Sequence, residues 1–439
     1  MLCRISNRPI RKKYLNHEYE LLTISTCNLW KKDLSLIGYR CCNVKIINIK
    51  NLEEAAAIFK KIGVDPYGID AMASKTINVN ILLEDQPCKI ANIIKQEMLS
   101  IGGDAAIARG SVSCSVPVSD ILIMGTLKQI SALAAKIEKQ PFGLEFIARD
   151  ILEILKNVAQ KEYVLKTSRR EIHLGKKTLI MGILNVTPDS FSDGGLFYSH
   201  KKAIEQGLRM AYEGADIIDI GGESTRPGSR SVPAGVELKR VIPVIDGLIK
   251  KNIPISIDTK KAQVAMLAVK AGAEIINDIS ALSSDKDMAK VVRETRAAVI
   301  IMHMRGNPRN MQKGNLAYDD LMGEITHYLK KSGEKALKAG IEKDCIIIDP
   351  GIGFGKTPED NYKIIQNLFE LKGLGMPVMV GTSRKSFIGK VTGGEPGDRI
   401  EGTAATVAAA IINGCHIVRV HDVAAMKKVA AVADAIAQA

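Results

Sequence analysis

The chain of 439 residues is poor in aromatic side chains, which make up 4% of it, and Trp30 is its one tryptophan. With so few aromatic rings, the core has to be built from Ile, Val, Leu, Ala and Met. Such aliphatic cores are typical of parallel sheets that are buried on both faces. The shortage also argues against a surface that stacks nucleic-acid bases on interleaved rings. We therefore expect an α/β protein that binds no nucleic acid.

Long hydrophobic runs are missing as well. No apolar stretch reaches the length of a membrane span, and the N-terminus lacks the apolar core of a signal peptide. The eight cysteines include no C-x-x-C pair, which argues against a zinc or redox motif, and they fit a reducing compartment. We expect a soluble cytoplasmic protein with no membrane partner.

Positive charge is concentrated at the start of the chain. The net charge is +13, and residues 1–50 hold ten Lys and Arg against three acidic residues. Residues 1–42 are predicted to be a basic leader that is disordered or absent from the mature protein. Residues 43–170 are predicted to form a smaller α/β domain of unknown role, starting with a strand at VKIINI (44–49), followed by a linker or hairpin at 161–177.

From residue 178 onward, short β-branched apolar runs alternate with amphipathic helices, which predicts right-handed βαβ crossovers and a parallel sheet. Eight such units in one domain favour a (β/α)8 TIM barrel over residues 171–439, with an open doubly wound sheet as the alternative. The predicted strands are 178–184, 216–220, 255–258, 274–278, 298–303, 345–349, 377–381 and 416–420.

Polar residues follow nearly every predicted strand. In a barrel these positions form the C-terminal mouth, where active sites lie. One such residue would be explained as a helix cap, but so many of them predict a functional site. They are Asn185, Glu223, Asp258, Asn277, His303, Asp349, Lys385, Arg419 and His421.

Cations gather near the end of the chain. Arg419 and His421 are two residues apart on a strand and hence on one face, which predicts a clamp for phosphate or diphosphate. Arg384 and Lys385 are expected to direct positive charge into the mouth. His303 is as consistent with packing as with ligand contact.

Neutral and acidic residues complete the predicted mouth. Asp258, Asn277 and Asp349 each end an apolar run. A carboxylate can accept two hydrogen bonds from the adjacent ring N–H and amine of a heteroaromatic edge, and an amide can both donate and accept. The alternative is that Asp258 and Asp349 pair with Lys385 and Arg419 only to stabilise the barrel.

Two loops after the first two strands, 183–195 and 221–229, are rich in Gly, Pro and hydroxyl residues, as lids often are. Phe191 is an apolar side chain on the first loop and suits closure over a flat ligand. Thr225 and Arg226 add a hydroxyl and a cation to the second.

Eight segments along residues 177–437 resemble the dihydropteroate synthase family of pterin-binding TIM-barrel enzymes. In chain order they are LNVTPDSFSDGG, GADIIDIGGESTRPG, SIDT, INDIS, DPGIGFGKT, GTSRKSFIG, EGTAATVAAA and RVHDV. The resemblance implies a transferase of folate biosynthesis, a target of sulfonamides, that joins 6-hydroxymethyl-7,8-dihydropterin diphosphate to p-aminobenzoate. It further implies that diphosphate leaves first and that the arylamine captures a pterin methylene cation.

The resemblance also implies roles for individual residues. The pterin pocket would consist of Asp258, Asn277, Asp349 and Lys385. Diphosphate and Mg2+ would be contacted by Asn185, Arg419 and His421, with Asn185 as the one direct protein ligand of the metal. The p-aminobenzoate site would be built from Phe191, Asp193, Thr225, Arg226, Pro227, Lys385 and Ser386. Catalysis would fall to Asp193, Lys385, Arg419 and His421, and a homodimer is a further implication.

Two other functions are weighed against the synthase. A corrinoid-type pterin-dependent methyltransferase shares the barrel and the pterin-edge residues, but it has no use for a diphosphate clamp or an arylamine loop. A non-catalytic pterin-binding partner would not need the intact loop segments seen here. The region 43–170 is the departure from a minimal enzyme of the family.

Overall fold

The computed structural model describes residues 44–187, 196–224, 229, 231–306, 311–312 and 316–439. They form two compact units that divide between Ile77 and Asn78. The boundaries expected at residues 42 and 170 from the sequence remain predictions.

The described part of the first unit contains two helices, α1 (Leu52–Ile62) and α2 (Pro66–Ala73). Helix α1 is capped at both ends. It begins at Asn51, whose side chain accepts a hydrogen bond from the Glu54 N–H, and it ends at Gly63 in the left-handed region, with a φ of 84°. The strand expected at residues 44–49 is wrong, because this segment has no regular secondary structure.

The second unit starts with a small antiparallel sheet in the strand order β1-β3-β2. Its aliphatic core, including Ile94, Ile123 and Leu133, lies between the sheet and its helices. The expected α/β character of this region is confirmed. The elements are β1 (Asn78–Pro87), α3 (Cys88–Ser100), β2 (Asp104–Ile107), the short 3-10 helix η1 (Arg109–Ser111), β3 (Val118–Thr126), α4 (Leu127–Ile137) and α5 (Leu144–Ala159).

A β-hairpin of β4 (Tyr163–Lys166) and β5 (Glu171–Leu174) follows, so the hairpin alternative for residues 161–177 is confirmed. Its apolar side chains pack against the first residues of several barrel strands, including Leu179 and Ile417. The hairpin therefore covers the end of the barrel opposite the mouth. Arg170 ties it there through a 2.8 Å ion pair to the buried Glu274.

Eight parallel strands form the barrel, in the order β11-β10-β9-β8-β7-β6-β13-β12. A parallel bridge between Ile348 and Val378 joins the two outer strands of that order and closes the sheet. The predicted barrel and all eight strands are confirmed. The strands are β6 (Leu179–Asn185), β7 (Ile217–Gly221), β8 (Ile255–Asp258), β9 (Ile275–Asp278), β10 (Ala298–Met302), β11 (Ile346–Asp349), β12 (Met379–Val380) and β13 (Ile417–Val420).

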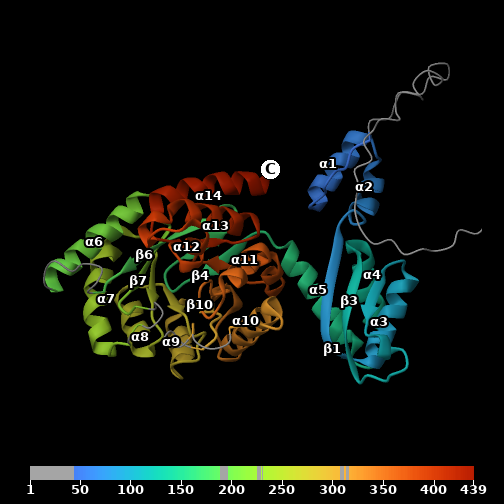
Figure 1. Ribbon diagram of the computed structural model, residues 1–439, viewed down its shortest axis with the longest axis horizontal. Coiled ribbons are helices and arrows are strands. Elements are labelled where there is room, and N and C mark those ends of the chain that lie inside the picture. The colour runs from blue at the N-terminus through green and yellow to red at the C-terminus, as the bar shows by residue number, and fades with distance from the viewer. Residues whose placement is uncertain (1–43, 188–195, 225–228, 230, 307–310, 313–315) are drawn as a thin grey trace, which may run out of the picture. The chain divides into compact units, whose positions relative to one another are not determined.

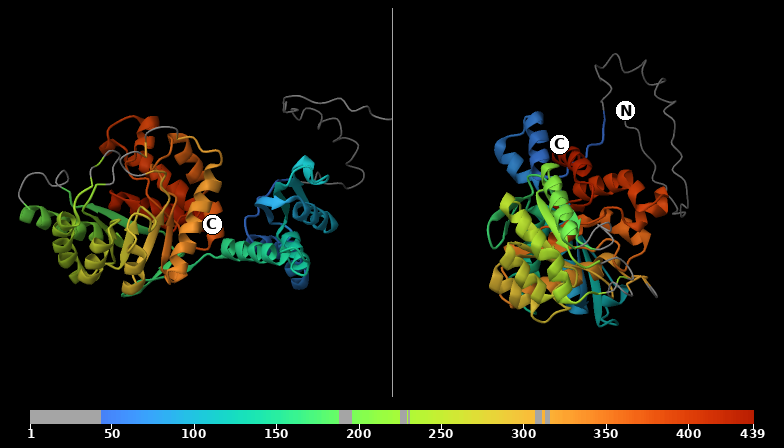
Figure 2. Two further views of the ribbon diagram at one scale, coloured as in Figure 1. Left: turned by 90° about the horizontal axis from the view of Figure 1, so that it is seen from below. Right: turned by 90° about the vertical axis from the view of Figure 1, so that its left-hand side faces the viewer.

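Helices surround these strands (Figures 1 and 2). They are α6 (Leu196–Tyr212), α7 (Ala234–Leu248), α8 (Ala262–Ala271), α9 (Met288–Thr295), α10 (Leu321–Lys338), α11 (Pro358–Gln366), α12 (Ser386–Thr392), α13 (Ile400–Ile412) and α14 (Val423–Gln438), with short 3-10 turns η3 (Ile249–Lys251), η4 (Lys343–Cys345), η5 (Leu368–Leu374) and η6 (Pro396–Asp398). Among the described residues, no helix combines the length and apolarity needed to cross a membrane.

The strands are buried almost throughout, which is why they read as continuous apolar runs. Each run ends where the backbone leaves the sheet and polar side chains can meet water or a ligand. Asn185, Asp258 and Asp349 are the last residues of β6, β8 and β11. The fold therefore brings them to one end of the barrel.

Candidate active site

Arg419 on β13 is the centre of a charged network at the barrel mouth. Its Nε donates to Asp219 Oδ2 at 2.6 Å, and its Nη2 donates to Asp258 Oδ2 at 2.8 Å. Two carboxylates thus share one guanidinium. Burial raises the pKa of Asp258 to about 7 against the opposing effect of Arg419, and the neighbouring Asp219 adds to the increase. The predicted pairing of Asp258 with Arg419 is therefore present.

Asp219 is the residue that the sequence interpretation missed. It is fully buried in β7, and its Oδ2 also accepts from Asn277 Nδ2 at 3.2 Å. It therefore links the predicted amide of the pterin pocket to the predicted diphosphate clamp. The available signal was its position in the run DIIDI, because a carboxylate inside a buried strand requires a partner.

Asp349 and Lys385 form the second part of the mouth. Asp349 accepts a 2.7 Å hydrogen bond from the Gly351 N–H, and burial raises the pKa of its carboxyl. Burial lowers the pKa of Lys385 to about 8. The Lys385 Nζ donates to the Ile352 carbonyl and lies 4.4 Å from the centroid of the Phe354 ring.

A glycine makes room for that lysine. Gly353 has a φ of 79°, and a Cβ at this position would lie 2.9 Å from Lys385 Cδ. The loop after β11 thus depends on a residue without a side chain. The Phe354 ring and the Ile352 carbonyl of this loop form a surface of mixed aromatic and polar character beside Asp349.

His421 follows β13, and its Nδ1 lies 3.0 Å from Ser383 Oγ. Its backbone N–H donates to the same hydroxyl at 3.2 Å. Ser383 therefore orients the ring at the mouth. The expectation that Arg384 directs charge into the mouth is wrong, because its Nε donates to Asp422 at 3.0 Å and the two form an ion pair.

A magnesium ion fits the donors near Asn185. Mg2+ prefers oxygen ligands and commonly keeps waters and substrate phosphates alongside one or two protein ligands. Asn185 is half-buried, and a Cβ at the neighbouring Gly221 would lie 3.6 Å from its Oδ1 and 3.7 Å from Asp258 Cβ. Because Gly221 has no side chain, that space stays available beside the amide oxygen.

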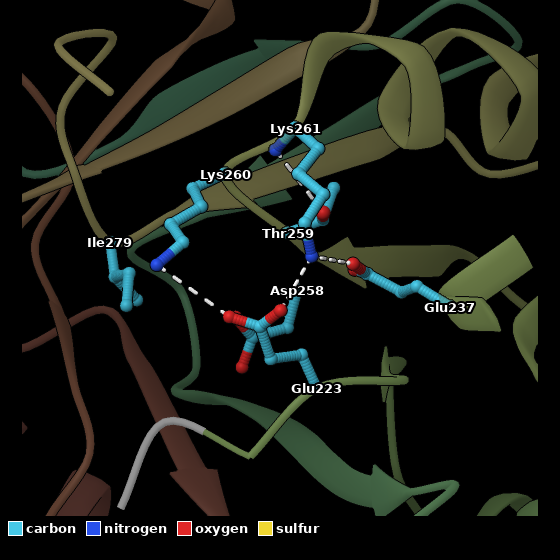
Figure 3. A pocket seen from close by; sticks show the side chains of 7 residues that line it. All are labelled: Glu223, Glu237, Asp258, Thr259, Lys260, Lys261 and Ile279. Atoms are coloured by element: carbon cyan, nitrogen blue, oxygen red, sulfur yellow. Dashed lines mark hydrogen bonds and ion pairs between the residues drawn. The ribbon is translucent and has the colours of Figure 1, made fainter. Parts of the chain in front are cut away.

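A small pocket opens beside Asp258, next to Glu223, Glu237 and Lys261 (Figure 3). Lys261 lies between the carboxylates of Glu223 and the fully buried Glu237, and it forms ion pairs with both. Glu223 also accepts from the Val232 N–H at 3.0 Å. Glu223 thereby holds together the two ends of the segment that follows β7.

The predicted p-aminobenzoate site includes Ser386 and five residues of the two loops. Ser386 is the exposed first residue of α12. Five others lie outside the described residues: Phe191, Asp193, Thr225, Arg226 and Pro227. Their roles remain predictions. His303 is buried in packing beneath the mouth, with its ring edge-on to Tyr328 at 5.0 Å between centroids.

Comparison with known proteins agrees with this geometry. The model of the family described as pterin binding enzyme matches residues 181–421. A dihydropteroate synthase of Synechocystis sp. is 50% identical over 265 residues, which are 60% of this chain and 91% of that protein. The structure of Xanthomonas albilineans dihydropteroate synthase in complex with 7,8-dihydropteroate is 40% identical, with a TM-score of 0.56, and covers 62% of this chain and 98% of its own.

A longer relative reaches further along the chain. A probable bifunctional folylpolyglutamate synthase/dihydropteroate synthase of Halobacterium salinarum is 36% identical over 379 residues, which are 86% of this chain and 45% of that protein. A match of this length cannot fit within residues 171–439, so it extends into the region before the barrel. The chain belongs to the pterin-binding enzyme family and, within it, to the dihydropteroate synthases.

Proposed function

We propose that the chain condenses 6-hydroxymethyl-7,8-dihydropterin diphosphate with p-aminobenzoate to give 7,8-dihydropteroate and diphosphate. The observation that carries the proposal is the mouth itself. There Arg419 lies in one network with Asp258 and Asn277, and Asp349 lies near Lys385. The part around Arg419 suits a leaving anion. The part around Asp349 and Lys385 suits a heteroaromatic edge.

Recognition of the pterin rests on Asp349, Asn277 and Lys385. The Asp349 carboxylate accepts from the ring N–H and the exocyclic amine, and the Asn277 amide reads the remaining edge. Lys385, already beside the Phe354 ring, covers the bicyclic system. Asp258 is the second carboxylate available to the ring.

Departure of diphosphate rests on Arg419 and His421. The hydrogen bonds of Arg419 to Asp219 and Asp258 use its Nε and Nη2. The guanidinium has further N–H groups that can contact phosphate. His421, oriented by Ser383, supplies a second contact. When bound through Asn185, Mg2+ would neutralise part of the charge that grows on the leaving group. Such electrostatic stabilisation is usually the largest catalytic contribution.

Capture of the methylene cation requires the arylamine and exclusion of water. We assign p-aminobenzoate to Phe191, Thr225, Arg226, Pro227, Lys385 and Ser386, and stabilisation of the cation to Asp193. We also propose that the enzyme works in the cytoplasm and as a homodimer. Sedimentation velocity of the purified chain tests the dimer directly.

The decisive assay combines the purified chain with both substrates and Mg2+ and follows 7,8-dihydropteroate by chromatography. Turnover that depends on p-aminobenzoate and Mg2+ is the expected result. Pterin binding without turnover would instead favour a non-catalytic partner. Methyl transfer from a methylated pterin would favour the methyltransferase alternative.

We expect Asp349→Asn to weaken binding of every pterin ligand. An amide cannot accept from both donors of the edge, and loss of a hydrogen bond to a charged group costs about 1.5–3 kcal/mol, or roughly 10- to 150-fold in affinity. Isothermal titration with free pterin measures the loss. Unchanged affinity in a folded variant would mean that Asp258 or another group recognises this edge.

We expect the region before the hairpin to be dispensable for turnover, since every assigned residue lies between 185 and 421. A chain that started near Thr167 would lack β4 and the buried Tyr163 and Leu165. A chain that begins at Lys161 keeps the hairpin and should retain activity. A folded but inactive truncation would show that the earlier region is needed at the mouth.

We expect p-aminobenzoate to bind poorly to the free enzyme and better once diphosphate, Mg2+ and a pterin are present. Most arylamine residues lie on the two loops 183–195 and 221–229, and we expect diphosphate, Mg2+ and pterin to supply contacts that order these loops, so each ligand should favour the other. A coupling of about 1–3 kcal/mol, or roughly 5- to 150-fold, is typical. Titrations with and without the other ligands measure it. Equal affinity for p-aminobenzoate with and without the other ligands would contradict this ordering of the loops.

A further inference from the structure

Lys356 is a buried lysine that the proposed reaction does not use. It ends the loop after β11, and its side chain and backbone together are 3% exposed. Its Nζ lies 2.9 Å from His303 Nδ1 and donates to the Phe354 carbonyl at 3.1 Å. Among the described residues, no carboxylate lies within ion-pair distance of this ammonium.

Such a position is unfavourable for a lysine that only fills space. Burying an ammonium without an adjacent carboxylate costs several kcal/mol, whereas a methionine of similar length would carry no such cost. Burial lowers the pKa of Lys356 to about 7. Burial also lowers the pKa of His303 to about 2, so its neutral ring can accept a hydrogen bond from the lysine ammonium.

The surroundings of Lys356 point to Asp349. The charged groups that face the lysine are Asp349, Lys385, Asp360 and Arg305, and Asp349 is the strongest of them in favouring the protonated amine. In return, Lys356 opposes the increase that burial causes in the pKa of Asp349, together with the Gly351 N–H, Lys385 and Arg419. His303, which Lys356 contacts, donates its backbone N–H to the Asp349 carbonyl at 2.9 Å, so a single residue separates the lysine from the residue assigned to the pterin edge.

The same lysine also fastens the loop that shapes the pocket. Phe354, whose carbonyl it holds, carries the ring beside Lys385. The Tyr318 hydroxyl donates to the Gly355 carbonyl at 2.9 Å, and the Gly353 N–H donates to Asn361 at 2.6 Å. Lys356 joins these loop contacts to His303, the residue that follows β10.

We propose that Lys356 is a positioning residue for pterin recognition: its buried amine anchors the loop after β11 between His303 and the Phe354 carbonyl, and it supplies positive charge on the Asp349 side of the mouth. The inference rests on the assignment of Asp349 to the pterin edge in the proposed function. It extends that function by placing a positive charge on the Asp349 side of the mouth.

Two substitutions of Lys356 distinguish its anchoring of the loop from the effect of its charge. Lys356→Gln keeps a donor for the Phe354 carbonyl but has no charge, and Lys356→Met has neither. Lys372→Met is the matched control, since Lys372 in η5 is another lysine whose pKa burial lowers, and it contacts the Phe369 ring. Thermal unfolding of each variant reports loss of structure.

The readout is the affinity for free 6-hydroxymethylpterin, measured by titration at a series of pH values. Without the lysine charge, Asp349 takes up its proton at a higher pH. Both Lys356 variants should therefore lose about tenfold in affinity below neutral pH, where wild-type Lys356 is protonated. The difference should narrow above neutral pH, where the wild-type amine is neutral as well. Lys372→Met should follow the wild-type profile.

An equal loss at every pH, or a wild-type profile in Lys356→Gln, overturns the electrostatic role. If neither variant folds, NMR of lysine labelled at Cε in the wild-type chain gives the answer. A Lys356 that stays neutral throughout the acidic range of pterin binding refutes the proposal. Absence of synthase turnover in the wild type would leave these binding tests intact and would count against the proposed function alone.

Discussion

Replacing Arg419 with alanine is expected to lower kcat/KM at least about 100-fold, which is the usual cost of removing one preorganised electrostatic contact to a developing charge. Arg419 is the cation that both Asp219 and Asp258 share. Its loss removes the contact to departing diphosphate. Affinity for the pterin diphosphate should fall much more than affinity for the free pterin, and titration with both ligands measures the difference. Equal losses would contradict the clamp.

The same substitution should also destabilise the fold. Removing one partner of a buried ion pair typically costs about 3–5 kcal/mol, because the remaining charge is left without compensation. Arg170→Ala is the matched control, since it deprives the buried Glu274 of its arginine at the other end of the barrel. Both variants should unfold at lower denaturant concentration. Arg170→Ala alone should keep the affinity for pterin diphosphate.

His421→Ala separates the two effects. His421 is half-buried, and Ser383 contacts both its ring and its backbone N–H. Removal of the histidine should weaken binding of the pterin diphosphate with little change in unfolding free energy. A stability loss as large as that of Arg419→Ala would mean that the histidine has a structural role.

The barrel could be predicted from the sequence because its strands are buried on both faces. Ile, Val and Leu then fill most positions, and a polar residue often marks the end of a strand and the beginning of the mouth. This rule found Asn185, Asp258 and Asp349 at the ends of β6, β8 and β11. It depends on local chemistry alone, so no tertiary information was needed.

The pairing of side chains across the mouth could not be predicted in this way. Asp219 precedes the end of β7, and its importance follows from Arg419, which lies 200 residues away in sequence. Arg384 and Lys385 are adjacent, yet one pairs with Asp422 and the other reaches the Ile352 carbonyl. Arg384 has a φ of 59°, and this unusual backbone geometry leaves no signal in residue type.

Buried charge in the loop after β11 was hidden for a different reason. A lysine after a glycine-rich loop reads as exposed, because lysine is seldom fully buried. Lys356 is buried since Gly351 and Gly355, both with positive φ, bring the loop back against β10. A Cβ at Gly351 would lie 1.9 Å from the His303 carbonyl oxygen. The close approach is therefore possible only for glycine.

Asp258→Asn is expected to stabilise the fold above neutral pH while it impairs function. Burial raises the pKa of Asp258 to about 7, whereas an aspartate in an unfolded chain titrates at about 3.9. Between these two values the folded chain holds a proton that the unfolded chain has lost. The free energy of unfolding therefore falls as pH rises from about 4 to about 7.

The Asp258→Asn variant does not show this fall in the free energy of unfolding, because its amide does not titrate. Asp219 is then the one carboxylate of the pair that interacts with Arg419. Relative to wild type the variant should gain a few kcal/mol at about pH 8 and almost nothing at about pH 4. Urea unfolding at both pH values measures the gain. Glu274→Gln is the contrasting control, since among the described residues Glu274 does not share Arg170 with a second carboxylate and its loss should destabilise the fold at about pH 8.

Pterin affinity should fall in the Asp258→Asn variant, although its stability rises. If Asp258 is held in this unfavourable position for the pterin, Asp258→Asn should lose about tenfold or more in pterin affinity, as expected for a hydrogen bond to a charged acceptor. Stability given up at a binding site is a common trade-off in enzymes. A variant that is both more stable at about pH 8 and fully active would mean that Asp258 serves neither the ligand nor the fold. A variant that is less stable at both pH values would mean that its ion pair with Arg419 outweighs the cost of burying two carboxylates together.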